Sequence, residues 1–126
     1  MIIEFDGYWI WLLKKEQPNY EITGKYLFFS EDKNKLIELA KNEIVNHSFH
    51  QAKVNESTID RNKEHVLCLY YKDDSRSNEL ATRNEQEYKV KFRYWKSDED
   101  TRKGKYSKEF LGNLSEENKE FFTKEN

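Results

Sequence analysis

The densest group of polar residues lies in one stretch near the end of the chain. It comprises Lys96, Asp98, Thr101, Arg102, Lys103 and Lys105, with Tyr106 directly after them. Lysine and arginine bind phosphate through charge-assisted hydrogen bonds, and a threonine hydroxyl can add another. Gly104 would let the backbone approach a ligand closely. We therefore expect a phosphate-binding loop; the alternative is a solvated loop in which Gly104 makes a turn.

Lys53 is a second candidate, because it lies between Ala52 and Val54 in a predicted strand. A lysine that faces a pocket can contact phosphate, or can act as an acid or base if burial lowers its pKa. The alternative is an edge-strand lysine that prevents aggregation.

His47 and His50 flank a Ser-Phe pair and could carry protons as a general acid or base. Their spacing and the lack of a cysteine pair do not indicate a metal site, so we expect neither a metal nor another cofactor. Solvation at a helix end is the alternative for His47, and His65 at a strand start is interpreted in the same way.

The tryptophans Trp9, Trp11 and Trp95 are expected to pack largely in the core. One of them could still stack on a nucleotide base. Alternation along the last predicted strand places Trp95 on the same face as Lys91 and Arg93, where cations and an aromatic ring would meet.

The elements that must position these residues follow from the apolar pattern. Period-two patterns and aromatic or β-branched residues predict strands at 8–14, 25–29, 51–55, 66–72 and 89–95. Helical spacing predicts helices at 30–47, with Ser30 as the cap, and at 75–88, with a further short helix at 115–122. This order predicts an α+β fold: a curved, mainly antiparallel sheet of about five or six strands with two or three helices on one face.

Composition limits the class of protein. The chain has 126 residues, of which 37% are charged and 15% aromatic, so we expect a folded domain with a very polar exterior. We place one domain at 1–108, followed by an acidic tail or short helix at 109–126. The net charge of -2 hides a basic segment, because residues 89–108 carry eight basic and three acidic side chains.

Several partners and locations are unexpected on these grounds. No apolar run approaches the roughly 20 residues that span a bilayer, so we expect no membrane association. The weakly acidic chain gives no sign of binding duplex nucleic acid. The single cysteine, Cys68, suits a reducing compartment, and we expect a cytoplasmic protein.

Three segments, in order, resemble the basophilic-leukaemia-expressed protein family, which is also labelled a phosphothreonine lyase domain. They are Thr-Gly-Lys-Tyr-Leu-Phe-Phe at 23–29, Ala-Lys-Val at 52–54 followed by an apolar strand at 65–70, and a K-x-D-x-x-T-x-x-G-x-Y pattern at 96–106. The resemblance implies the fold of the cap-binding translation initiation factor. Small phage and plasmid relatives resemble proteins that bind or cleave cyclic nucleotide immune messengers.

The residues and the resemblance together give a functional hypothesis. We expect metal-independent cleavage of a cyclic nucleotide or cyclic oligonucleotide messenger in a counter-immune role, with catalysis by Lys53, Lys96 and Thr101 and proton transfer by His47 or His50. The expected ligand contacts are Trp9, Trp11, Lys91, Arg93, Trp95, Asp98, Arg102, Lys103, Lys105 and Tyr106. The alternatives are a non-catalytic binder that sequesters such a nucleotide or a cap-like one, and a protein-interaction domain. A homodimer would suit a symmetric ligand.

Overall fold

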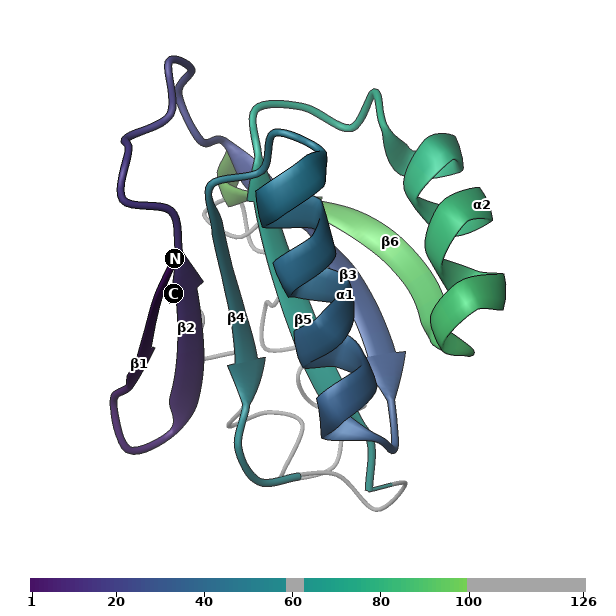
Figure 1. The fold of residues 1–126 in the computed structure, drawn as a ribbon. Helices are drawn as coiled ribbons and strands as arrows, with labels where there is room; N and C mark the ends of the chain where they lie inside the picture. Colours follow the sequence, from purple (N-terminus) through teal and green to yellow (C-terminus); the bar gives the residue numbers. More distant parts are fainter. Residues whose placement is uncertain (59–62, 100–126) are drawn as a thin grey trace.

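The fold is an open, curved sheet with two helices (Figure 1). The computed structural model describes residues 1–58 and 63–99. The strands are β1 (Ile2–Phe5), β2 (Trp9–Leu13), β3 (Gly24–Ser30), β4 (Gln51–Asn55), β5 (His65–Tyr71) and β6 (Lys91–Ser97), and the helices are α1 (Lys33–Asn46) and α2 (Ser77–Tyr88). The spatial order is β1-β2-β4-β5-β3-β6, and every neighbouring pair is antiparallel. The predicted α+β class is confirmed.

Both helices pack on one side of the sheet, which we call the helix face. Alternate strand residues point to this side, and α1 contributes an apolar stripe at spacings of three and four residues. The buried core consists of Leu12, Tyr26, Phe28, Ala52, Val54, Leu67 and Leu69 from the strands, Leu36, Leu39, Ala40 and Ile44 from α1, Leu80 from α2, and Phe49 and Val90 from the connecting segments. Figure 1 shows α1 lying along the middle strands and α2 beside β6.

The start of α1 differs from the prediction by two residues. Asp32 is the cap, and its side chain accepts a hydrogen bond from the backbone N–H of Asn34. Ser30 ends β3 instead, and its hydroxyl accepts from the N–H of Asp32 at 3.0 Å. The predicted end of α1 near 46–47 is confirmed, since the helix ends at Asn46 and His47 is its C-terminal cap.

Strand β1 was not predicted. It pairs with β2 through a turn at Gly7 and Tyr8, in which Gly7 has a φ of 98°. A positive φ at the first central position is typical of a two-residue hairpin loop and suits glycine. The Asp6-Gly7 pair between two apolar segments was the available signal for this hairpin.

Strand β6 corrects two expectations. It begins at Lys91, after Lys89 closes α2 in the left-handed conformation, and it runs to Ser97. Lys96 therefore lies in a strand. The prediction that a loop begins at Lys96 was wrong, because the strand continues to Ser97. A bulge opposite Leu27 and Phe28 shifts the alternation, so the expected shared face of Trp95, Lys91 and Arg93 was also wrong. The predicted loop and helix residues from 100 onward lie outside the described residues.

Candidate functional site

The side of the sheet opposite the helices carries the candidate site. We call it the lysine face, and its residues are Trp9, Trp11, Lys25, Leu27, Phe29, Lys53, Val66, Cys68, Tyr70, Tyr94 and Lys96. Strand pairing aligns them in rows across the sheet. Lys53 lies opposite Trp11 on one side and Cys68 on the other, and Lys25 lies opposite Tyr70 and Lys96.

The lysines of this face are almost entirely buried. Lys25, Lys53 and Lys96 are 3%, 4% and 0% exposed. Lys53 is in a central strand, between β2 and β5, so its interpretation as an edge-strand lysine was wrong. Lys25 was not among the candidates, although it alternates with Tyr26 in an apolar strand and could have been found from that pattern.

Aromatic rings surround the ammonium group of Lys53. Its Nζ lies 4.0 Å from the ring centroid of Trp9, 5.3 Å from that of Trp11 and 6.0 Å from that of Tyr70. The electron-rich ring faces attract the cation, and more strongly where water is excluded. The Nζ of Lys25 is 5.6 Å from the Tyr70 ring in the same way. The ammonium groups of Lys25 and Lys53 thus lie within 6.0 Å of aromatic ring centroids.

Asp6 fixes the ring of Trp11. Its carboxylate accepts hydrogen bonds from Trp11 Nε1 at 2.9 Å and from the backbone N–H groups of Tyr8 and Trp9 at 2.9 and 2.6 Å. These bonds, that of Trp11 first, hold the pKa of Asp6 below its ordinary value. Sequence reasoning missed Asp6, although an aspartate just before a turn glycine is a recognised turn signal.

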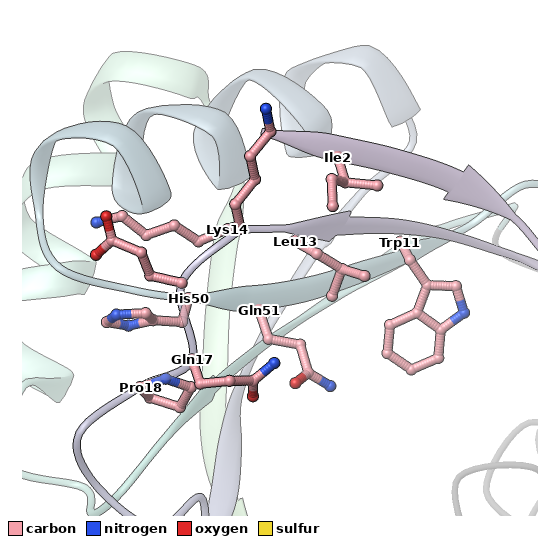
Figure 2. A pocket seen from close by; sticks show the side chains of 10 residues that line it. Ile2, Trp11, Leu13, Lys14, Gln17, Pro18, His50 and Gln51 are labelled. Carbon is pink, nitrogen blue, oxygen red and sulfur yellow. The ribbon is translucent and has the colours of Figure 1, made fainter.

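A hollow of about 390 Å³ opens beside Trp11, at the end of β2 (Figure 2). Leu13, Gln51 and Trp11 line it from the lysine-face positions of β2 and β4, and Figure 2 shows Gln51 between Trp11 and His50. The complete lining is Ile2, Trp11, Leu13, Lys14, Lys15, Glu16, Gln17, Pro18, His50 and Gln51. This site brings together two predicted residues, Trp11 and His50, and adds two lysines that were not predicted.

A second hollow of about 420 Å³ shares Lys14, Glu16, Gln17 and His50 with the first. It is lined by Lys14, Glu16, Gln17, Asn19, Tyr20, Ser48, His50, Tyr71 and Lys72. The Nδ1 of His50 lies 3.2 Å from the hydroxyl of Tyr20, and burial raises the pKa of Tyr20 to about 12. His50 is therefore held by a neutral phenol at the junction of the two hollows.

Other predicted site residues lie away from this hollow. His47 caps the end of α1, and its carbonyl accepts from Arg76 Nη1 at 2.9 Å. Trp95 packs on the helix face, with its ring centroid 4.8 Å from that of Tyr26. Neither residue lines either hollow.

Of the remaining predicted residues, some belong to the part of the chain that the structure describes and the others do not. Arg93 stacks on Phe29 at 4.4 Å and pairs with Glu64 at 2.9 Å, while Lys91 is exposed. The backbone N–H of Asp98 donates to the carbonyl of Thr23 at 2.7 Å. Thr101, Arg102, Lys103, Lys105 and Tyr106 lie outside the described residues.

Residues 1–58 and 63–99 contain no cluster of three or more histidine, cysteine, aspartate or glutamate side chains placed to hold a metal ion. In the same part of the chain, no helix is long and apolar enough to cross a bilayer. No family model matches the sequence, and no curated protein or solved structure matches it either. The family resemblance of the three segments therefore stays a prediction.

Proposed function

We propose that the protein binds a phosphate-bearing nucleotide, of the cyclic nucleotide or cyclic oligonucleotide class, in the hollow beside Trp11. The observation that carries this proposal is the arrangement of a fixed indole ring, a buried lysine 5.3 Å from it and two further lysines among the lining residues. A volume of about 390 Å³ lies in the range of sites for small ligands.

Trp11 supplies the surface for a base. Its ring is half-buried, so part of it reaches the hollow, and the bond to Asp6 fixes its orientation before a ligand arrives. A ring held in advance loses little conformational entropy on binding. Stacking of a base on an aromatic side chain contributes about 1–3 kcal/mol.

Lysines supply the counter-charge for phosphate. Lys14 and Lys15 line the hollow, with one acidic residue, Glu16, among them. Lys53 lies 5.3 Å from the Trp11 ring in a buried environment, where its field is screened less than at the surface. Three lysines and two carboxylates, those of Glu16 and Asp6, thus lie near the Trp11 ring.

Metal-independent cleavage is the second candidate function, and one observation favours it. His50 lines the same hollow as Trp11 and could accept the proton of a ribose 2′-hydroxyl. The hydroxyl oxygen would attack the adjacent phosphorus, the bond from phosphorus to the 5′-oxygen would break, and that oxygen would take up a proton. A linear product with a cyclic phosphate end would result.

Calorimetric titration in EDTA tests the proposal with cyclic di-AMP, cyclic GMP–AMP, cyclic tetra-adenylate, 3′,5′-cyclic AMP and a cap analogue as probes. We expect at least one to bind, and Trp11→Ala to weaken that affinity by at least about tenfold. Lys14→Ala should lower both affinity and its salt dependence. The matched control Lys41→Ala removes a lysine of α1 that lines neither hollow, and it should change neither.

Chromatography of the incubated probes separates the two candidates. Intact ligand recovered in stoichiometric amount indicates a binder, whereas a linear product whose formation His50→Ala stops indicates the enzyme. Absence of heat and of thermal stabilisation with every probe would contradict nucleotide binding and favour the protein-interaction alternative.

A further inference from the structure

The outer edge of β1 is an apolar strip. Met1, Ile3 and Phe5 are 43%, 53% and 60% exposed, and Ile2 is 37% exposed. Natural edge strands usually carry a lysine, a proline or a bulge that prevents pairing with another chain. Strand β1, whose sequence is Ile-Ile-Glu-Phe, has no lysine, proline or bulge, and its protection is limited to its length of four residues and the single charge of Glu4.

The hairpin geometry identifies the backbone groups that point outward. The N–H of Asp6 donates to the carbonyl of Trp9 at 3.1 Å, so this pair is a hydrogen-bonded one. Hydrogen-bonded and non-bonded pairs alternate along antiparallel strands. Glu4 and Ile2 therefore direct their backbone groups toward β2, while those of Ile3 and Phe5 point away from the sheet.

We propose that β1 is an interaction surface for a second copy of this chain, joined by antiparallel β1–β1 pairing about a two-fold axis at Ile3. In this register Ile3 faces Ile3 of the second copy and Met1 faces Phe5. The outward backbone groups of each strand then bond to the other, and the exposed apolar side chains become each other's neighbours.

Charge selects this register over the next one. With the axis at Ile3, Ile2 lies opposite Glu4 of the second copy. With the axis shifted to Glu4, the two Glu4 carboxylates would lie directly opposite each other, and like charges in that position destabilise a strand pair. A two-fold axis perpendicular to the sheet also puts the helix faces of both copies on the same side, because directly opposite residues point to the same side of a sheet.

The opposite edge of the sheet lacks these properties. Strand β6 is bulged, its exposed positions are Lys91 and Arg93, and α2 packs against it. These features protect an edge from pairing. The proposed assembly is therefore a closed dimer with one sheet of twelve strands, six from each copy, and not an open filament.

Sedimentation equilibrium of the full chain without nucleotide tests the proposal. We expect a concentration-dependent dimer, and Ile3→Lys should raise its dissociation constant at least about tenfold because it places two ammonium groups opposite each other. Val45→Lys is the matched control, because Val45 is 64% exposed on α1 and receives the same charge away from the edge. Circular dichroism checks that both variants fold.

Cross-linking tests the register. Cα atoms of a hydrogen-bonded antiparallel pair lie about 5.5 Å apart, which fits a disulfide. Ile3→Cys should form an intermolecular disulfide when diamide accepts the two electrons and two protons from the thiols. Ile2→Cys should cross-link far less, since its two copies are offset along the strands. Cys68 is buried and unchanged in both variants.

A monomer at every concentration, or a dimer that Ile3→Lys leaves intact, would overturn the proposal. Equal cross-linking of Ile2→Cys and Ile3→Cys would overturn the register. All these measurements omit nucleotide, so their outcome is independent of the proposed binding function.

Discussion

The two faces of the sheet come from the same strands but differ in chemistry. On the helix face, successive strands contribute Leu12, Val54, Leu67 and Phe28, all fully buried and apolar. On the lysine face, alternate residues of the same strands include Lys53 and Lys25, which are also buried. Neighbouring residues of one strand therefore lie in different environments, one on the helix face and the next on the lysine face.

Burial has opposite consequences on these faces. An apolar side chain gains free energy when it leaves water, whereas an ammonium group loses hydration that its new surroundings must replace. Residues of similar volume such as methionine or leucine would fill the lysine positions without that cost. The apolar helix face stabilises the fold, and under the proposed function the lysine face, which also buries Trp9, Leu27, Val66 and Cys68, supplies the binding residues.

The largest expected effect is on the helix face. Phe28 is fully buried, and its ring centroid lies 5.2 Å from that of Phe92. Phe28→Ala should lower the free energy of unfolding by about 3–5 kcal/mol, because it leaves a cavity under the helices. Urea denaturation measures this change, with exposed Val45→Ala as a control that should cost less than about 0.5 kcal/mol. A loss below about 1 kcal/mol at Phe28 would contradict our division of the faces.

The helix face also buries one charged side chain, that of Glu43, and a substitution can break its ion pair with Arg83. The Glu43 carboxylate is fully buried on α1 and accepts from Arg83 Nε at 2.9 Å and Nη2 at 2.6 Å. Glu43→Gln should cost about 2 kcal/mol, because Arg83 then loses its buried charged partner, although it keeps Glu79 at 3.1 Å and still reaches solvent. Urea denaturation compares it with Glu38→Gln, an exposed pair with Lys41 that should cost under about 0.5 kcal/mol. Equal costs would show that burial of Glu43 is irrelevant.

Sequence patterns predicted most of this architecture. Strand β4 has the predicted bounds, and α1 and β5 begin or end within a few residues of theirs, because apolar periodicity dominates where an element is buried on one or both sides. Exposed β1 was missed because pairing with β2, and not burial, maintains it. The β6 bulge could not be predicted, since it depends on the partner strand.

The site was predictable only in part. Lys53 and Trp11 were recognised from residue type, and pairing of β2 with β4 places them opposite each other. The hollow was not predicted, because it forms where the chain leaves β2 and passes the start of β4. The backbone N–H of Lys14 donates to the carbonyl of His50 at 2.9 Å there. This is a tertiary contact, which sequence patterns do not predict.

Lys53→Met tests the lysine face directly. Methionine has a similar length and no charge, so the free energy of unfolding should change by no more than about 1 kcal/mol. Nucleotide affinity should fall by at least about tenfold, because the ammonium group 5.3 Å from the Trp11 ring is lost. Denaturation and calorimetric titration measure the two quantities on one sample. A large loss of stability with unchanged affinity would make Lys53 a structural residue and would reverse the comparison.

The smallest expected effect concerns the surface charges of the helix side. Hydrogen bonds from Arg76 first, and from Arg83, lower the pKa of Glu79 to about 2 from an ordinary value of 4.5. A carboxyl whose pKa is lower in the folded state stabilises the protein above its ordinary pKa and loses that contribution as the pH falls toward the folded value. The side chain of Glu79 is 42% exposed, so solvent screening limits its contribution to under about 1 kcal/mol.

Glu79→Gln should therefore lower the free energy of unfolding slightly at pH 6, and its difference from the native chain should shrink between pH 4.5 and about 2. Urea denaturation across this range measures the difference. If the chain unfolds in acid before pH 2, the carbonyl ¹³C shift of the Glu79 carboxyl gives the same pKa by titration. A midpoint near 4.5 would mean that the arginine bonds do not persist in solution, and it would confine the electrostatic contribution of the helix side to the buried Glu43 pair.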